Sequence, residues 1–287
     1  MTKYIFVTGG VVSSLGKGIV SASVGRILKN KNIDVSIMKL DPYLNVDPGT
    51  MSPFQHGEVF VTSDGSETDL DLGHYERFIN EELNKYSSTT AGAIYREIIE
   101  NEREGKYLGG TIQTIPHVTN LIKEKIFLAA EKSNCEVMIV EVGGTIGDIE
   151  GQPFIEAIRQ IRSEFGQQNS LFLHLTLLPK LGATGEVKTK PTQHSINSLR
   201  GMGIQPDFMV CRSDDEIDSG IKDKLSLHCD VKLERIFSLE TLDTIYAVPL
   251  ALESQQLGDK ISEFLELNQE KSDLDNWNDM VNIIRSE

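Results

Sequence analysis

Short apolar runs alternate with amphipathic stretches along most of the chain. Runs that suit buried strands lie at residues 4–7, 35–40, 136–142, 171–178 and 207–211, with shorter candidates at 111–115, 235–239 and 245–248. Apolar residues recur at helical spacing at 19–31, 91–104, 118–132 and 154–165, and shorter helices are predicted near 69–78 and before 200. Strands that alternate with helices form parallel sheets covered on both faces. The pattern therefore predicts an α/β fold, a Rossmann-like parallel sheet with helices on both faces.

Polar segments follow several of the predicted strands. The four longest candidates lie at residues 9–18, 39–75, 143–150 and 180–194. Because ligands bind beyond the carboxyl ends of parallel strands, we expect these four segments to meet at one edge of the sheet. Near the end of the chain, Leu274, Trp277, Val281 and Ile284 recur at helical spacing after a polar stretch, which predicts a linker and a short amphipathic helix.

The first polar segment joins a strand to a helix and is rich in glycine. Gly16 and Gly18 flank Lys17, so a flexible backbone, a helix N-terminus and a cation meet there, which is typical of a phosphate site and of a P-loop NTPase-like fold. The match to the usual phosphate loop is imperfect, because five residues separate Gly10 from Gly16 and no Ser or Thr follows the lysine. The alternative is a glycine-rich turn with an exposed lysine. If phosphate binds here, a metal ion needs ligands from elsewhere.

Two carboxylates are candidates for those ligands. Glu141 ends a strongly apolar strand, where an acid is hard to explain by packing, and Asp71 lies in an acidic run before a helix. Two carboxylates, phosphate oxygens and water suit Mg²⁺. The alternatives are an ion pair at the sheet edge for Glu141, and a solvated charge or a helix N-cap for Asp71.

A second group of charged residues lies in the later loops. Lys188 and Lys190 place two cations in one segment, and Lys39 adds a third at a strand end. In an acidic chain, clustered lysines indicate a second anionic ligand, although a solvated basic loop is the alternative. Asp148 and Glu150 are candidates for accepting hydrogen bonds from sugar hydroxyls.

Composition narrows the class of protein. The 287 residues carry a net charge of −15, which argues against non-specific binding of nucleic acid. Three cysteines are too few and too scattered for a disulfide framework. Neither an N-terminal signal peptide nor an apolar run of membrane-spanning length is present, so we expect a cytoplasmic protein without a membrane partner.

Five long motifs then resemble one family. They are Tyr4 to Gly18, Lys39 to Pro53, Glu67 to Phe78, Glu141 to Glu150, and Gly185 to Ser195. Together they are similar to the N-terminal synthetase (amidoligase) domain of the CTP synthase family, with a fold like that of dethiobiotin synthetase. The resemblance implies a ligase of pyrimidine biosynthesis. In this reaction ATP phosphorylates the 4-oxygen of UTP and ammonia displaces the phosphate to give CTP.

The resemblance also implies roles for individual residues. It assigns ATP to Ser14, Leu15, Gly16, Lys17, Gly18, Ile19 and Asp71, with the adenine near Glu240, Thr241 and Leu242. It assigns Mg²⁺ to Asp71 and Glu141. It assigns UTP, or CTP as feedback inhibitor, to Ser13, Asp148, Ile149, Glu150, Lys188, Thr189, Lys190, Pro191, Thr192, Gln193 and Lys224. Lys17 and Lys39 would be catalytic, because they would offset negative charge during phosphoryl transfer.

The family continues into a glutaminase domain that this sequence does not contain. We therefore expect a synthetase domain at residues 1–267 and, at 268–287, a linker helix that would lead to the absent domain. Free ammonia, not glutamine, is the expected nitrogen source. The resemblance also implies a homotetramer and possible filaments.

Two other functions compete with this one. The first is a related phosphate-loop ligase or ATPase that acts on another substrate. The second is a structural assembly protein without activity. The segment at 188–193 and Lys224 argue against the first, and the presence of Lys17, Asp71 and Glu141 argues against the second.

Overall fold

The computed structural model describes residues 2–182 and 185–286. Its strands are β1 (Lys3–Gly9), β2 (Val35–Asp41), β3 (Phe60–Val61), β4 (Glu67–Thr68), β5 (Ser88–Thr90), β6 (Val137–Val142), β7 (Ser170–Leu177), β8 (Phe208–Ser213) and β9 (Ile236–Glu240). Its α-helices are α1 (Lys17–Lys29), α2 (Pro53–His56), α3 (Asp71–Ile79), α4 (Ala91–Arg103), α5 (Thr119–Ser133), α6 (Gln152–Phe165), α7 (Lys190–Gly201), α8 (Ser219–Cys229), α9 (Val248–Glu253), α10 (Leu257–Phe264) and α11 (Asp275–Ser286).

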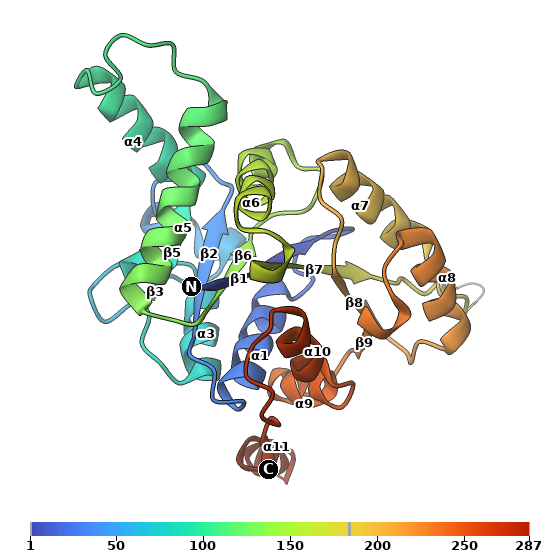
Figure 1. Ribbon diagram of the computed structural model, residues 1–287. Coiled ribbons are helices and arrows are strands. Elements are labelled where there is room, and N and C mark those ends of the chain that lie inside the picture. Colours follow the sequence, from blue (N-terminus) through green and yellow to red (C-terminus); the bar gives the residue numbers. More distant parts are fainter. Residues whose placement is uncertain (1, 183–184, 287) are drawn as a thin grey trace.

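The described residues form a parallel sheet of seven strands, in the order β5-β2-β6-β1-β7-β8-β9. Helices α1, α3, α9, α10 and α11 pack on one face, and α4, α5 and α6 pack on the other (Figure 1). A smaller apolar cluster joins α7 and α8 to β8 and β9. The predicted parallel α/β sheet with helices on both faces is confirmed.

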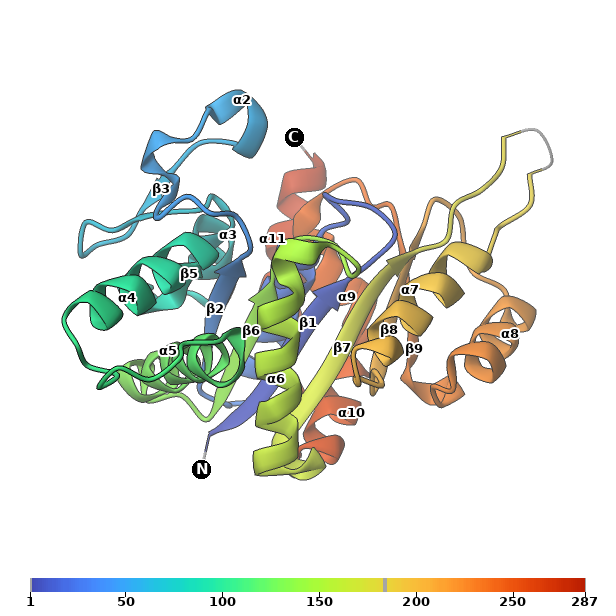
Figure 2. The same ribbon diagram turned by 90° about the horizontal axis from the view of Figure 1, so that it is seen from above.

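All seven strands point the same way, so their carboxyl ends share one edge. Figure 2 shows the segment with α2 and the loops after β1 and β7 at this edge, while the N-terminus lies at the opposite edge. The segment at 42–70 contains the short helix α2 and the hairpin of β3 and β4. The fold therefore gathers the predicted polar segments at one rim.

Two predicted strands are wrong. Residues 111–113 are irregular and Thr114–Val118 form a helical turn, so this described stretch contains no strand. Its β-branched residues favour a strand locally, but most of them are exposed and no neighbouring strand pairs with them.

The predicted strand at 245–248 is instead a 3₁₀ turn, Ile245–Ala247, that leads into α9. The Thr244 hydroxyl accepts a hydrogen bond from the Tyr246 amide at 3.4 Å and caps the turn. Pro249 lies in the first turn of α9, where its fixed φ favours a helix. The apolar run is too short for its period to distinguish a strand from a helix. The capping contacts therefore determine that it is helical.

Candidate functional site

The glycine-rich segment places a buried amine at the start of α1. Only 8% of Lys17 is exposed, and its Nζ donates a hydrogen bond to the Gly144 carbonyl at 2.7 Å. Burial lowers the pKa of this amine, and the nearby charge of Glu141 partly opposes the shift. The alternative of an exposed lysine is therefore wrong. The contact also joins the segment after β1 to the segment after β6.

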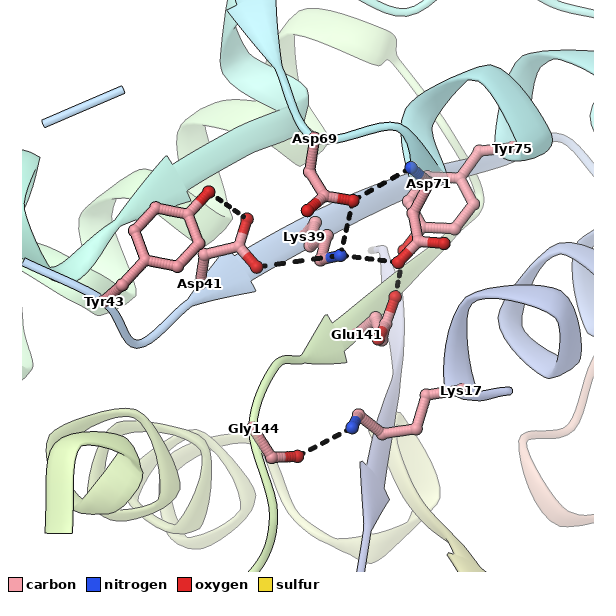
Figure 3. Close-up of polar contacts among 9 residues, drawn as sticks. All are labelled: Lys17, Lys39, Asp41, Tyr43, Asp69, Asp71, Tyr75, Glu141 and Gly144. Atoms are coloured by element: carbon pink, nitrogen blue, oxygen red, sulfur yellow. Dashed lines mark hydrogen bonds and ion pairs between the residues drawn. The ribbon is translucent and has the colours of Figure 1, made fainter. Parts of the chain in front are cut away.

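Lys39 lies in the middle of a carboxylate cluster (Figure 3). Its Nζ lies 2.8 Å from Asp69, 2.5 Å from Asp71 and 3.7 Å from Asp41. Burial alone would lower the pKa of Lys39, but the surrounding carboxylates outweigh it and the pKa is raised well above its usual value. Lys39 is thus held as a cation in a buried position.

Glu141 lies beside Lys39 because their strands are in register. Lys39 of β2 pairs with Glu141 of β6, so both side chains continue the apolar stripe that faces α1 and α3. Only 3% of Glu141 is exposed, and the Tyr75 hydroxyl of α3 donates to its Oε2. Burial raises the pKa of Glu141. Glu141 thus accepts a hydrogen bond from a tyrosine hydroxyl inside the fold, and the nearby charges of Lys39 and Lys17 oppose the rise of its pKa.

Asp71 opens α3 and lies against the start of α1. A Cβ atom at residue 18 would lie 2.5 Å from Asp71 Oδ1, so glycine is what allows this carboxylate to approach the helix start. Asp71 also pairs with Lys39, and its backbone amide donates to Asp69 Oδ1 at 2.9 Å. The N-cap residue of α3 is Leu70, so Asp71 is neither the cap nor a freely solvated charge.

The carboxylates that surround Lys39 offer only oxygen, the donor that Mg²⁺ prefers. Among the described residues, no group of three or more His, Cys, Asp or Glu side chains forms a complete metal site. Asp71 and Glu141 offer carboxylate oxygens, and a metal ion held by them would have to take its remaining ligands from phosphate and water.

A pocket of about 110 Å³ lies on the other side of α1. It is lined by Leu15, Gly16, Ile19, Val20, Arg212, Leu239, Glu240, Thr241, Leu242, Thr244, Ile245 and Val248. The predicted adenine segment at 240–242 therefore lies beside the phosphate segment. Arg212 was not predicted; its Nη1 donates to the Leu15 carbonyl at 3.1 Å and helps to fix the loop.

The segment after β7 is more exposed. Lys188 pairs with Glu186 at 2.5 Å, and this hydrogen bond together with the charge of Lys224 lowers the pKa of Glu186. Lys190 and Lys224 are exposed, whereas Thr192 and Gln193 are buried at the start of α7. The structure therefore brings the predicted cations at 188 and 224 to one surface.

The remaining predicted nucleotide residues are distributed around this rim. Ser13 and Ser14 are exposed on the loop before α1, and Thr189 and Pro191 lie at the start of α7. Asp148 accepts a hydrogen bond from the Thr145 amide at 2.9 Å, and Ile149 and Glu150 next to it are exposed.

A buried histidine, which was not predicted, links the end of β1 to α7. His174 of β7 lies 2.8 Å from Thr8 through Nδ1 and 2.8 Å from Ser195 of α7 through Nε2. Burial, and secondarily the charge of Lys17, lowers the pKa of His174 to about 3. A Cβ atom at Gly10 would lie 1.7 Å from Ser195 Oγ, so α7 directly contacts the glycine-rich segment.

One of the supporting residues, Asp41, could have been found by alternation along its strand. Asp41 lies two residues after Lys39, on the same face of β2, and its carboxylate also accepts a hydrogen bond from Tyr43 at 3.2 Å. Burial raises the pKa of Asp41 to about 7, although Lys39 opposes the shift. The roles of Tyr75 and His174 had no comparable signal, because both have the spacing of ordinary core residues.

The fold and this rim define a class of protein: a parallel α/β protein in which a glycine-rich turn, a helix start, two buried lysines and several carboxylates converge at one edge of the sheet. No described helix is long and apolar enough to cross a membrane.

Comparison with known proteins gives the family. The family model for the CTP synthase N-terminus matches residues 3–267, and the chain belongs to that family. It is 57% identical over 287 residues to a CTP synthase of Staphylococcus epidermidis, and 56% identical over 286 residues to one of Bacillus mycoides. Each alignment covers 100% of this chain and 54% of the relative, so the chain spans about half the length of these relatives.

Among solved structures, the signal recognition particle receptor FtsY from Elizabethkingia anophelis in complex with GDP matches with a TM-score of 0.43 and 11% sequence identity. That match covers 89% of this chain and 64% of the other.

Proposed function

We propose that this chain catalyses the ATP-dependent amination of UTP to CTP through a 4-phosphorylated UTP intermediate. Family membership supports the reaction class. The observation that carries the proposal is the buried amine of Lys17, which lies between the start of α1 and Gly144, beside a carboxylate cluster. A helix start and a desolvated cation together favour the polyphosphate of ATP.

Asp71 and Glu141 are the proposed ligands of Mg²⁺. Both present carboxylate oxygens to the rim, and the missing side chain at Gly18 brings Asp71 close to the start of α1. Mg²⁺, when bound, would neutralise charge on the phosphate oxygens. Tyr75 holds Glu141, and Lys39 with Asp69 holds Asp71, so both carboxylates have fixed supports.

The chemistry then requires positioning more than covalent catalysis. The 4-oxygen of UTP attacks the γ-phosphorus of ATP, the bond to the bridging oxygen breaks, and ADP leaves. Lys17 and Lys39 offset the negative charge that spreads over the transferring group. Ammonia then attacks C4 of the pyrimidine ring, and the phosphorylated oxygen leaves as inorganic phosphate. No protein nucleophile takes part.

The pyrimidine nucleotide would lie toward the segment after β7. Lys188 and Lys224 lie on one exposed surface with Glu186, and the start of α7 contacts Gly10 of the phosphate segment. A triphosphate there could be the substrate UTP or the inhibitor CTP. Ser13 and the segment 148–150 lie on the neighbouring loops of the same rim. The adenine of ATP would enter the pocket beside 240–242.

A homotetramer is part of the same proposal. A hollow of about 520 Å³ next to residues 148–150 is lined by Tyr95, Thr114, Ile115, Ile149, Gln152, Pro153, Ile155, Glu156 and Met202. Ile149 in this hollow is 77% exposed, so a second copy of the chain would remove apolar surface from water. Sedimentation velocity with and without ATP and UTP measures the assembly; a monomer under all conditions would contradict it.

The test of the proposed reaction uses the chain as it is. We incubate it with ATP, Mg²⁺, UTP and ammonium chloride and follow the ultraviolet shift that accompanies conversion of UTP to CTP. We expect turnover that depends on all four components. Absence of CTP at every ammonium concentration, with ATP still bound, would exclude amination of UTP and favour another phosphate-loop reaction. Absence of ATP binding would exclude the whole mechanism and favour a role in assembly.

A further inference from the structure

Helix α11 packs on the outside of the segment that lines the proposed adenine pocket. Trp277 of this helix is 8% exposed, and its Nε1 donates a hydrogen bond to the Tyr246 carbonyl at 2.7 Å. Its ring lies 5.2 Å from that of Phe78 and 6.1 Å from that of Tyr246, measured between centroids. Val281, one turn further on, is fully buried. Helix α11 therefore packs on the rest of the fold through the face that carries Trp277 and Val281.

A second contact between α11 and this segment lies near the end of the helix. Arg285 donates two hydrogen bonds to the Asp243 carboxylate, at 2.7 and 2.9 Å. This pair is exposed, with 44% of the arginine and 55% of the aspartate side chain accessible. Two contacts, one buried and one exposed, thus hold residues 243–246 from the outside.

The inner side of this segment faces the pocket. Leu242, Thr244 and Ile245 line the pocket of about 110 Å³, opposite Leu15 and Gly16 of the loop before α1. Asp243 and Tyr246, the residues that α11 holds, are the direct neighbours of these pocket residues along the chain. A shift of the outer residues would therefore move the wall of the pocket.

We propose that α11 is a positioning element for ATP, and that Trp277 and Arg285 act through residues 243–246 to set the affinity of the pocket for the adenine nucleotide. This inference rests on the proposed binding of ATP at that pocket. A wall that is already held in place loses less conformational freedom when the nucleotide binds, so affinity is higher. Among the described residues, the side-chain hydrogen bonds and ring contacts of Trp277 and Arg285 go to Tyr246, Phe78, Arg26 and Asp243 and not to the lysines and carboxylates of the rim, so the chemical step should be unaffected.

Trp277 also supplies a direct measurement. It is the one tryptophan in the sequence, and it is bonded to the segment that the nucleotide would contact. Titration with a non-hydrolysable ATP analogue should change its fluorescence emission and yield the dissociation constant. This signal does not depend on turnover.

The first variant is Arg285→Ala, which leaves the tryptophan in place. An exposed ion pair contributes up to about 1 kcal/mol, so we expect the dissociation constant of the analogue and the KM for ATP to rise by about two- to fivefold. The kcat and the thermal unfolding midpoint should stay near their original values. The matched control is Ile283→Ala on the same helix, because Ile283 is 61% exposed; it should bind the analogue like the original chain.

The second variant is Trp277→Phe, which keeps an aromatic ring in the core but removes the hydrogen bond. Calorimetric titration should show the analogue binding more weakly by about two- to tenfold, the loss expected for one hydrogen bond. Unchanged affinity in both variants would overturn the inference while leaving ATP binding intact. A fall in kcat and in the unfolding midpoint, without a change in affinity, would assign α11 a structural role only. If the original chain binds no analogue, both the inference and the proposed function fail.

Discussion

Lys39 of β2, Glu141 of β6 and Lys17 at the start of α1 are buried beside one another, whereas the charged side chains beyond β7 and on α8 lie nearer the surface. Lys39 lies among three carboxylates, and Glu141 has a tyrosine hydroxyl as partner. Lys188 pairs with Glu186 of its own loop, and Lys224 is exposed. The charged groups of the first region are thus more buried than those of the second.

This difference suits the two regions to different roles. Charges in a desolvated region interact more strongly than charges in water, and groups that are already positioned need no rearrangement during the reaction. The buried region is therefore suited to stabilising a transition state. The exposed region, in which salt and water screen the charges, is suited to recognising a triphosphate with modest energy from each contact.

Replacement of Lys17 should have the largest effect, because it removes charge from the buried region. In Lys17→Met the stem of the side chain keeps its packing while the amine is lost. We expect kcat for CTP formation to fall by about 10²–10³-fold. The exposed Lys132→Met is the control and should keep full activity. Near-normal turnover of Lys17→Met, with circular dichroism unchanged, would mean that the buried cation is not used.

Loss of the Tyr75 hydroxyl should have the next largest effect. Tyr75→Phe keeps the buried ring but frees the Glu141 carboxylate that it holds. Supporting residues of metal ligands typically contribute 10–100-fold to metal affinity, so the Mg²⁺ concentration for half-maximal activity should rise by about that factor. Electron paramagnetic resonance of Mn²⁺ in the presence of the ATP analogue measures the same loss without turnover.

The control for this variant is Tyr4→Phe. Tyr4 is also buried, but it packs on the opposite face of the sheet against Phe6 and Phe127. It should leave the metal dependence unchanged. Equal effects of the two substitutions would show that Tyr75 contributes packing and not orientation of Glu141.

His174, which joins the two regions, should affect the free energy of unfolding of the chain in acid. Its pKa is lowered from 6.5 to about 3 by burial, so between these values the unfolded chain binds a proton that the folded chain does not. Its contribution to the free energy of unfolding is complete above pH 6.5 and falls by about 1.4 kcal/mol per pH unit as the pH drops toward 3. In His174→Gln this slope should be absent, as measured by urea unfolding at a series of pH values.

An exposed histidine separates this effect from general acid sensitivity. His228 on α8 is exposed, so His228→Gln should keep the pH dependence of the original chain. If His174→Gln and the original chain lose stability in parallel between pH 6.5 and 3, the buried ring does not control acid unfolding.

Substitution in the exposed region should have the smallest effect. In Lys188→Ala we expect KM for UTP to rise by up to about fivefold with kcat nearly unchanged, because an exposed ion pair contributes up to about 1 kcal/mol. Lys180→Ala is the control in the same loop, since Lys180 pairs with Asp215 at 2.5 Å. Steady-state kinetics at several salt concentrations measure both. A loss of kcat as large as that of Lys17→Met would abolish the distinction between the two regions.

The sequence by itself determined the parallel α/β sheet and the edge at which the polar segments meet. Alternation of apolar runs and amphipathic stretches is a local property, and the direction of parallel strands then places their carboxyl ends together. The same alternation placed Lys39 and Glu141 at strand ends. The amphipathic pattern also predicted the helix that became α11, in which Trp277 and Val281 are buried and Ile284 is 39% exposed.

Only the tertiary structure decided which groups support the site. The three-residue strand β5 forms because it pairs with β2, and it has no periodicity of its own. Tyr75, His174 and Trp277 have the spacing of core residues, and their partners lie 66, 21 and 31 residues away along the chain. A hydrogen bond of this kind depends on register and helix packing, which no local pattern encodes. Local sequence patterns therefore determine the edge of the sheet at which the charged groups gather, and the packing of helices on the sheet determines how each group is held.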